Sequence, residues 1–344
     1  VLDLGGCFVI VNTRELHVIR AARLSFRLAG IILASAALAG GPGSTTGAFL
    51  KLPSGARAIA MGEAYAAGGD DIQALGWNPA GLAGVKKREF TFMHSEWVQD
   101  IRYESVAYAQ PMTNFITVAG GVDFMFSGDI RGTAFGDMAR GLAEGPENVP
   151  YATLAKSFSA SNVVLTAGAA VDVSGMRWIA IPSVQAGMNV RALLQKIADQ
   201  SANGAVVDVG ARWGPTFAPN LTLALVGQNL GPSINSKGTP ITMRLGAAYR
   251  LLDRNLLLDL DYYQPVDNYG RISAGAEYWY RNMLAIRGGY GFQHEADLNK
   301  LDTNGLEGLT LGCGFRYQMV QVDYAFRTEG FLGAAHRMSL TFKF

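Results

Sequence analysis

The chain has 344 residues, with 29 Lys and Arg against 28 Asp and Glu, and a formal net charge of +1 at pH 7. This balance lacks the polybasic signature of nucleic-acid-binding proteins, so we expect no nucleic-acid partner. Glycine is abundant at 42 residues and charged residues make up only 17% of the chain, which favours a β-rich fold with many tight turns over a helical enzyme.

Residues 18–39 have the features of a secretory signal peptide. The apolar run from Leu28 to Ala39 is shorter than the roughly 20 residues that a transmembrane helix needs. It ends in a small-x-small pattern that predicts cleavage after Ala39. Residues 1–17 carry acidic side chains that do not fit a signal peptide, so we interpret them as a misassigned start, with Val18 as the initiator. The basic residues that precede the apolar run are Arg20, Arg23 and Arg27.

Residues 40–87 form a predicted plug segment with short helical turns ahead of the strands. Asn78 and Pro79 are typical of the N-cap and the first position of a helical turn. In the alternative interpretation, Trp77 or Asn78 contacts a ligand in a lumen. The pair Asp70–Asp71 offers hard oxygens for a cation, but a turn followed by an N-cap accounts for it equally, and we predict no metal site.

From residue 88 to residue 344, apolar and polar residues alternate with a period of two. In the segment 320–327 one side carries only apolar or aromatic residues and the other carries mostly polar ones. The same division recurs in 243–250, 256–263, 271–278 and 309–317. Strands of about nine residues with one apolar face and one polar or glycine face are what a transmembrane β-barrel requires, because lipid covers only one face.

A soluble β-sandwich is the alternative, since alternation alone does not distinguish a lipid face from a core face. Three features favour the barrel. The strands are longer than the roughly five or six residues usual in sandwiches, and aromatic residues gather at strand ends, as in Tyr278–Tyr280. The last residues, Arg337–Phe344, alternate to a terminal Phe and resemble the recognition signal of outer-membrane barrels.

We therefore predict an all-β fold, a transmembrane antiparallel up-and-down β-barrel over residues 88–344. The expected location is the outer membrane of a Gram-negative cell. The expected partners are outer-membrane lipid and, during biogenesis, the barrel-assembly machinery.

The connections between strands alternate in length, as expected for short periplasmic turns and longer surface loops. A barrel whose chain starts and ends in the periplasm has an even number of strands, whereas the pattern from residue 88 gives a count of 15. The region 163–197 can hold two strands or three, so we expect 14 strands, with 16 as the alternative. The short connections are predicted at Pro111–Asn114, Ala160–Asn162, Ala218–Asn220, Asp253–Asn255, Arg281–Asn282 and Gln318–Met319. The longer ones are predicted at Ser127–Pro150, Leu230–Pro240, His294–Glu307 and Thr328–Ala335.

Charged side chains of both signs project from the polar strand faces. A selective pore would show one dominant sign, so mixed signs predict a lumen filled by ion pairs and by the N-terminal segment rather than an open channel. Eight residues are the candidate contacts of the lumen and the plug. They are Arg57, Trp77, Asn78, Arg244, Asp259, Asp261, Arg316 and Asp323.

Nothing in the sequence indicates catalysis. No Gly-x-Ser-x-Gly elbow occurs, and the four His residues lie in the leader or near strand ends, whereas a hydrolase needs a nucleophile beside a positioned base. No glycine-rich loop joins a strand to a helix in the way that phosphate binding needs. We predict a protein that is not an enzyme and has no cofactor.

A set of short motifs runs through the plug segment and the strands. The motifs are Phe49–Pro53, Gly55–Ala58, Ala60–Gly62, Ala64–Tyr65, Asp70–Asp71, Trp77–Ala83, Lys196–Asp199, Ser201–Gly204, Gln228–Pro232, Arg244–Arg250, Gly275–Trp279 and His336–Arg337. In these motifs the chain resembles the PorV/PorQ family of outer-membrane proteins, which is related in fold to the FadL-type fatty-acid channels. The resemblance implies a 14-stranded barrel whose N-terminal segment folds inside or across the lumen, and for some members a role in type IX protein secretion. Residues 163–184 depart from the family pattern.

Two functions remain open at this point. By resemblance, the chain is a protein export or surface-assembly factor whose long loops, above all 127–150, bind a secreted cargo protein. The alternative is a FadL-like passive channel for hydrophobic small molecules such as long-chain fatty acids, with the N-terminal segment as its plug.

Overall fold

The structure is a computed structural model that describes ten ranges of the chain. The predicted signal peptide 18–39 lies outside them, as do most of the predicted loops 127–150 and 294–307. No helix among the described residues is long and apolar enough to cross a membrane. The described ranges are 2–3, 8–9, 44–96, 101–128, 130–132, 155–175, 183–198, 200–293, 307–329 and 333–344.

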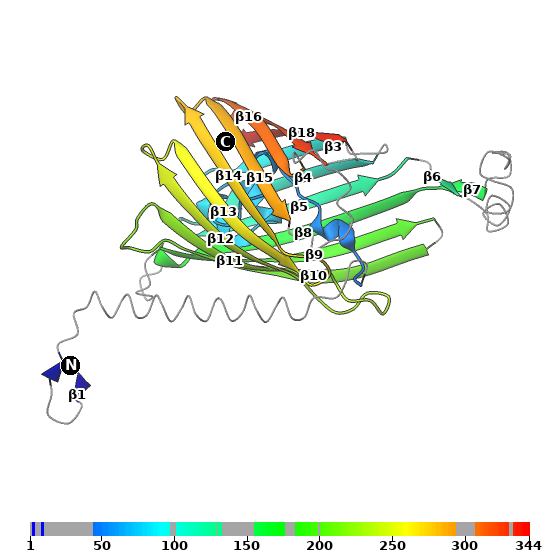
Figure 1. Ribbon diagram of the computed structural model, residues 1–344, viewed down its shortest axis with the longest axis horizontal. Helices are drawn as coiled ribbons and strands as arrows, with labels where there is room; N and C mark the ends of the chain where they lie inside the picture. The colour runs from blue at the N-terminus through cyan, green and yellow to red at the C-terminus, as the bar shows by residue number, and fades with distance from the viewer. Residues whose placement is uncertain are drawn as a thin grey trace.

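Fourteen antiparallel strands close into one barrel, which confirms the predicted fold class and strand number (Figure 1). Each strand pairs with the next one along the wall, and β18 pairs with β3 to complete the ring. The wall strands are β3 (Glu89–Glu96), β4 (Arg102–Pro111), β5 (Ile116–Phe126), β8 (Ala160–Asp172), β9 (Val184–Ile197), β10 (Gln200–Trp213), β11 (Leu221–Leu230), β12 (Thr242–Leu251), β13 (Leu256–Pro265), β14 (Arg271–Tyr280), β15 (Leu284–Gln293), β16 (Leu309–Tyr317), β17 (Val320–Thr328) and β18 (Ala334–Lys343).

Two smaller strand pairs lie outside the wall. Strands β6 (Ile130–Gly132) and β7 (Ala155–Phe158) pair with each other beyond the ends of β5 and β8 (Figure 1). Near the start of the chain, β1 (Leu2–Asp3) pairs with β2 (Phe8–Val9).

The region 163–197 contains two wall strands, β8 and β9, with a short 3-10 turn, η7 (Val173–Gly175), after β8. The predicted connection at Ala160–Asn162 is wrong, because these residues begin β8 and Ser161 pairs with Phe126 of β5. The tight turn lies instead between β9 and β10, where Ile197 pairs with Gln200. Polar residues here mark the part of a long strand near the rim, so polarity alone does not indicate a turn.

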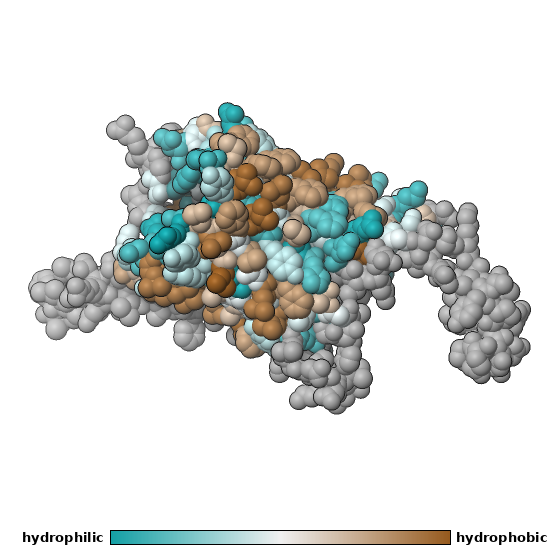
Figure 2. Space-filling model, turned by 90° about the horizontal axis from the view of Figure 1, so that it is seen from above, coloured by the Kyte–Doolittle hydropathy of each residue, from teal (hydrophilic) through white to brown (hydrophobic). Residues whose placement is uncertain are grey.

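The outer face of the wall is apolar. In β13, Leu258 and Leu260 are 41% and 52% exposed, whereas Asp259 and Asp261 point into the barrel and are buried. Large exposed apolar side chains occur in this way on every wall strand except β17, whose outward apolar side chains are half-buried. Brown side chains gather across the part of the wall seen in Figure 2. An apolar surface of this extent is far larger than the patches of soluble proteins, which excludes the soluble sandwich.

Residues 44–87, called the plug below, fold inside the barrel. They form η1 (Ala48–Lys51), α2 (Ala56–Ala60), η2 (Ile72–Gly76) and η3 (Pro79–Gly84), and most of their side chains are buried. The Asp71 carboxylate caps η2 by accepting from the Gln73 amide, and the Asn78 side chain caps η3 by accepting from the Ala80 amide. Such caps satisfy amides that would otherwise be unpaired in the dry lumen.

Glycines on the inner face of the wall let the plug approach the sheet closely. A Cβ atom added to Gly275 of β14 or to Gly289 of β15 would overlap the backbone of Met61 and Gly62. Gly62 itself has a φ of 67°, in the left-handed region that glycine adopts most easily. The glycine face of these strands therefore receives the plug backbone.

Candidate functional site

Arg57 of α2 is the centre of an ion-pair cluster between the plug and the wall. Its guanidinium donates to both carboxylate oxygens of Glu277 on β14, at 2.8 Å and 2.6 Å. A third nitrogen donates to Asp70 at 3.0 Å and to Asp71 at 2.8 Å. Bidentate pairing of this kind is among the strongest polar contacts a protein makes. Arg57 thus joins both halves of the plug to the wall.

The cluster continues along β14–β17. Glu277 also accepts from Arg287 Nε at 2.6 Å, and Arg287 reaches Asp323 at 2.8 Å. Gln321 then links Asp323 to Arg316, whose guanidinium lies 4.2 Å from the ring centre of Trp279. Of the residues selected from the sequence, Arg57, Asp323 and Arg316 therefore belong to one network.

Asp259 and Asp261 of β13 accept hydrogen bonds from plug amides. One oxygen of Asp261 accepts from the amides of Tyr65 and Ala66, both at 2.9 Å, and Asp259 accepts from the Gly68 amide at 2.8 Å. These two carboxylates thus accept hydrogen bonds from plug amides that lie outside the helical turns.

The adjacent plug carbonyls are held by arginines of the wall. Arg212 of β10 donates to the Gly69 carbonyl at 2.7 Å. Arg250 of β12 donates to the Gly68 carbonyl at 3.2 Å and to Asp70 at 2.9 Å. The wall therefore supplies both donors and acceptors to the same stretch of plug.

Trp77, Asn78 and Arg244 contact other parts of the chain. The Trp77 indole donates to the Ser54 carbonyl at 2.8 Å, and the Asn78 amide donates to the Ala66 carbonyl at 2.7 Å. The Arg244 guanidinium lies 4.9 Å from the Trp77 ring centre and 4.4 Å from that of Tyr263. These three residues fix the fold of the plug against β12.

Two further anchors were not selected from the sequence. Glu63 forms ion pairs with Arg271 of β14 and Arg327 of β17. At the long-loop end, Lys51 donates to both oxygens of Asp267, at 2.8 Å and 2.7 Å. One indication of such an anchor was present in the sequence, namely a charged residue within a segment of small and apolar residues, as at Glu63.

Asp267 lies in the turn between β13 and β14, outside the wall strands. Burial alone would raise the pKa of its carboxyl, but the hydrogen bonds from Lys51 and Thr45 outweigh this effect and hold the pKa below its usual value. The carboxylate is therefore ionised at neutral pH and can retain the N-terminal end of the plug.

Towards β4, β5 and β8 the plug packs through apolar side chains. Among the described residues, no hydrogen bond or ion pair joins the plug to these three strands. Their contact is instead a cluster of mostly small apolar side chains. Its members are Ile72, Ala74, Leu75, Leu82, Ala83 and Val85 of the plug and Ala107, Ala109, Ala119 and Ala170 of the wall.

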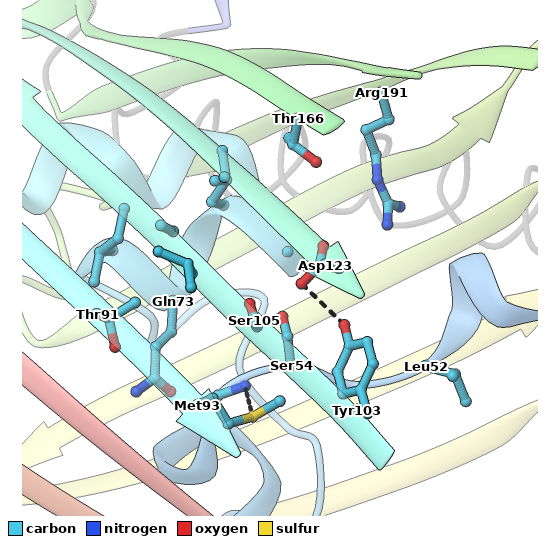
Figure 3. A pocket seen from close by; sticks show the side chains of 17 residues that line it. Leu52, Ser54, Gln73, Thr91, Met93, Tyr103, Ser105, Asp123, Thr166 and Arg191 are labelled. Atoms are coloured by element: carbon cyan, nitrogen blue, oxygen red, sulfur yellow. Dashed lines mark hydrogen bonds between the residues drawn. The ribbon is translucent and has the colours of Figure 1, made fainter. Parts of the chain in front are cut away.

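A polar cavity of about 40 Å³ lies beside this apolar contact, between the plug and β3–β5. Figure 3 shows Tyr103 donating to Asp123 across it, at 3.0 Å, and Met93 accepting from the Gly55 amide at 2.9 Å. A cavity of this size holds a few water molecules, whereas benzene needs roughly 150 Å³. This part of the lumen is therefore closed to organic solutes.

Solved structures with this fold include hydrocarbon channels. A TodX deltaS2S3 mutant, described as a monoaromatic hydrocarbon channel, has a TM-score of 0.58 at 13% identity, covering 85% of this chain and 99% of that chain. The toluene transporter TbuX of Ralstonia pickettii has a TM-score of 0.57 at 13% identity, covering 85% and 98%. The toluene transporter TodX of Pseudomonas putida has a TM-score of 0.55 at 12% identity, covering 88% and 96%. At these identities the likeness shows the fold alone.

Comparison with the sequences of curated proteins found no match. A family sequence model does match, over residues 34–342, a span that includes the plug and nearly the whole wall. The chain belongs to the family described as "Uncharacterised protein family (UPF0164)".

Proposed function

We propose that this chain is an outer-membrane channel for small hydrophobic solutes, and that the plug must move for a solute to pass. The carrying observation is the uneven attachment of the plug inside a FadL-like barrel. Among the described residues, hydrogen bonds and ion pairs join the plug to β3, β9–β14 and β16–β18. A cluster of apolar side chains joins it to β4, β5 and β8. A segment fastened in this way can leave one side of the wall while it stays attached to the other.

The filled space between the plug and β3–β5 favours a gated channel over an open pore. The cavity of about 40 Å³ next to the plug has no room for an aromatic or aliphatic solute. Charges of both signs between the plug and β14–β17 form internal ion pairs, such as Arg287 with Asp323, and so do not present the single sign of an ion-selective pore. A hydrophobic solute would need only the apolar contact to open.

The outer-membrane location rests on the apolar outer face of a closed barrel, which suits lipid contact. The solute class rests on the fold shared with channels named for monoaromatic hydrocarbons and toluene. Long-chain fatty acids remain the second solute class to test. The proposal involves no enzyme chemistry and no cofactor.

Solute uptake into liposomes tests the proposal. The mature chain in liposomes should take up labelled toluene or oleate faster than protein-free liposomes do, and should exclude labelled glucose. Deleting residues 48–82 should admit glucose as well, because the lumen would fill with water. Failure of the intact chain to take up either hydrophobic probe would contradict the proposal.

A second candidate is the export or surface-assembly role implied by the PorV/PorQ resemblance. It is favoured by the β6–β7 ribbon, which continues the wall beyond β5 and β8 and suits contact with a secreted cargo protein (Figure 1). Replacing residues 129–158 with a short Gly-Ser turn would separate the two candidates. A cargo-binding role predicts lost surface display of secreted proteins with unchanged solute uptake.

A further inference from the structure

A cavity of about 440 Å³ opens at the short-turn end of the barrel, opposite to the end where Lys51 meets Asp267. Its walls include the turn residues Arg254 and Asn282, and the connection from the plug to β3 supplies Lys86 and Lys87. Arg57 and Asp70 of the plug also line it. We call this cavity the short-turn vestibule. It is about ten times larger than the polar cavity beside β3–β5.

Positive charge dominates the short-turn vestibule. Seven cationic side chains line it against three carboxylates, an excess of four positive charges. The cations are Arg57, Lys86, Lys87, Arg250, Arg254, Arg316 and Lys343, and the carboxylates are Asp70, Glu89 and Glu277.

All three carboxylates already have basic partners. Glu277 pairs with Arg57 and Arg287, Asp70 pairs with Arg57 and Arg250, and Glu89 pairs with Lys343 at 3.1 Å. The carboxylates therefore neutralise the cations in and around the plug. None of the three carboxylates pairs with the cations nearer the mouth of the vestibule.

Four cations in the vestibule have no acidic partner. Within the described part of the chain, no carboxylate lies within 4.0 Å of Lys86, Lys87, Arg254 or Arg316. Arg316 is held in place by Gln321 and by the Trp279 ring, at 3.0 Å and 4.2 Å, so its guanidinium is oriented before any ligand arrives.

Like charges that line one cavity repel one another, and an anion bound in the vestibule would reduce this repulsion. We propose that the short-turn vestibule binds a phosphate-bearing anion. A dianionic phosphoryl group matches the charge excess better than a single carboxylate does. Guanidinium groups form paired hydrogen bonds to phosphate, and lysine adds compact charge. The volume leaves room for an organic group attached to the phosphate.

The phosphate can come from a soluble phosphorylated compound or from the headgroup of an anionic phospholipid, because the vestibule opens at an end of the barrel. Both sources present the same phosphoryl chemistry to Arg254, Arg316 and the two lysines. Binding at this end is independent of the proposed passage of hydrophobic solutes, so the two proposals can fail separately.

The test titrates the intact mature chain in a neutral detergent with inorganic pyrophosphate, using calorimetry. The double variant Lys87→Gln with Arg254→Gln removes two exposed cations that have no ion pair and is expected to fold. We expect its affinity for pyrophosphate to fall about tenfold or more, as for the loss of two charge-assisted contacts. The matched control is Arg281→Gln, because Arg281 is an exposed cation at the same end that does not line the vestibule.

A second arm identifies the source of the phosphate. It repeats the titration in nanodiscs with and without phosphatidylglycerol. Competition by this lipid in the parent chain, absent in the double variant, assigns the site to a headgroup; unchanged pyrophosphate binding assigns it to a soluble compound. The proposal is overturned if the parent chain does not bind pyrophosphate in detergent, or if the double variant binds it as tightly as the Arg281→Gln control does.

Discussion

The two sides of the plug are attached to the wall by different physical forces. Towards β12–β17, buried charges and backbone groups are paired, as between Arg57 and Glu277 or between Asp261 and the Tyr65 amide. Towards β4, β5 and β8, side chains as small as Ala107 and Ala170 provide the contact. Breaking a buried ion pair costs about 3–5 kcal/mol, whereas each small apolar contact contributes far less. The first side therefore acts as an anchor, and the second as a releasable face.

The largest effect is expected from Arg57→Met, which breaks the anchor at its centre. Glu277, Asp70 and Asp71 would lose their common partner, so unfolding in urea should require about 3–5 kcal/mol less. The variant should also show a steady ion conductance in planar bilayers, because the plug would loosen. Arg88→Met, at an exposed arginine just beyond the plug, is the matched control and should behave like the parent chain. If Arg57→Met unfolded at the same urea concentration as the parent chain, Arg57 would not be the centre of the anchor.

Asp261→Ala removes the part of the anchor that holds the plug backbone. The amides of Tyr65 and Ala66 would lose their acceptor, and a buried amide without a partner costs about 1–3 kcal/mol. We expect the free energy of unfolding in urea to fall by about 2–3 kcal/mol, since water can enter part of the space that the carboxylate leaves. Glu96→Ala removes an exposed carboxylate and controls for the change of charge. Equal stability of the two variants would mean that Asp261 does not hold the plug.

Leu75→Ala weakens the releasable face without exposing a charge. Leu75 packs beside a cavity. The free energy of unfolding should therefore fall by about 2 kcal/mol, near the low end of the range for replacing a buried leucine by alanine. The sharper readout is amide hydrogen exchange. Residues 72–85 should lose protection while residues 56–63 keep theirs. Leu260→Ala, on the outer face of the wall, should alter neither segment, and equal loss in both segments would show that the plug moves as one unit.

The smallest effect concerns pH at the N-terminal end of the plug. Because the pKa of Asp267 is depressed in the folded chain, its stabilising contribution is present above the ordinary value of about 4 and is lost as the pH falls below it. A fluorophore at Thr46→Cys, in a Cys313→Ser background, should report release of this end as the pH falls below about 4. Asp267→Asn should abolish the transition, and a transition that persists in this variant would assign it to another group.

Sequence reasoning succeeded where a single physical rule acts on every residue. Lipid on one face makes the period of two persist along the wall, so the barrel and the inward direction of Asp259 and Asp261 could be predicted. The strand number followed only when an even count was required as well. Rules that involve only neighbouring residues worked equally well, since the Asn78 side chain caps η3 by accepting from the amide two residues later.

The contacts of the plug could not be predicted, because they join residues far apart in the chain. Nothing near Arg57 indicates that Glu277, some 220 residues away, is its partner. The same holds for Trp77, because its ring lies against Arg244, which is also distant in the sequence. The wrong turn at Ala160–Asn162 has a related cause, since the length of β8 is set by pairing with β5 and β9.

The path of the plug has a consequence for how the molecule is assembled. The plug runs from Thr45, beside Gly238 at one mouth, to Arg88, which pairs with Phe344 at the other, and leads directly into β3. Strand β3 is also half of the seam that closes the ring with β18. If the ring closed first, the leading end of the chain would have to be threaded through the whole barrel. A sheet that is still open can instead wrap around a plug already in place, so we expect the seam between β3 and β18 to be the last pairing to form.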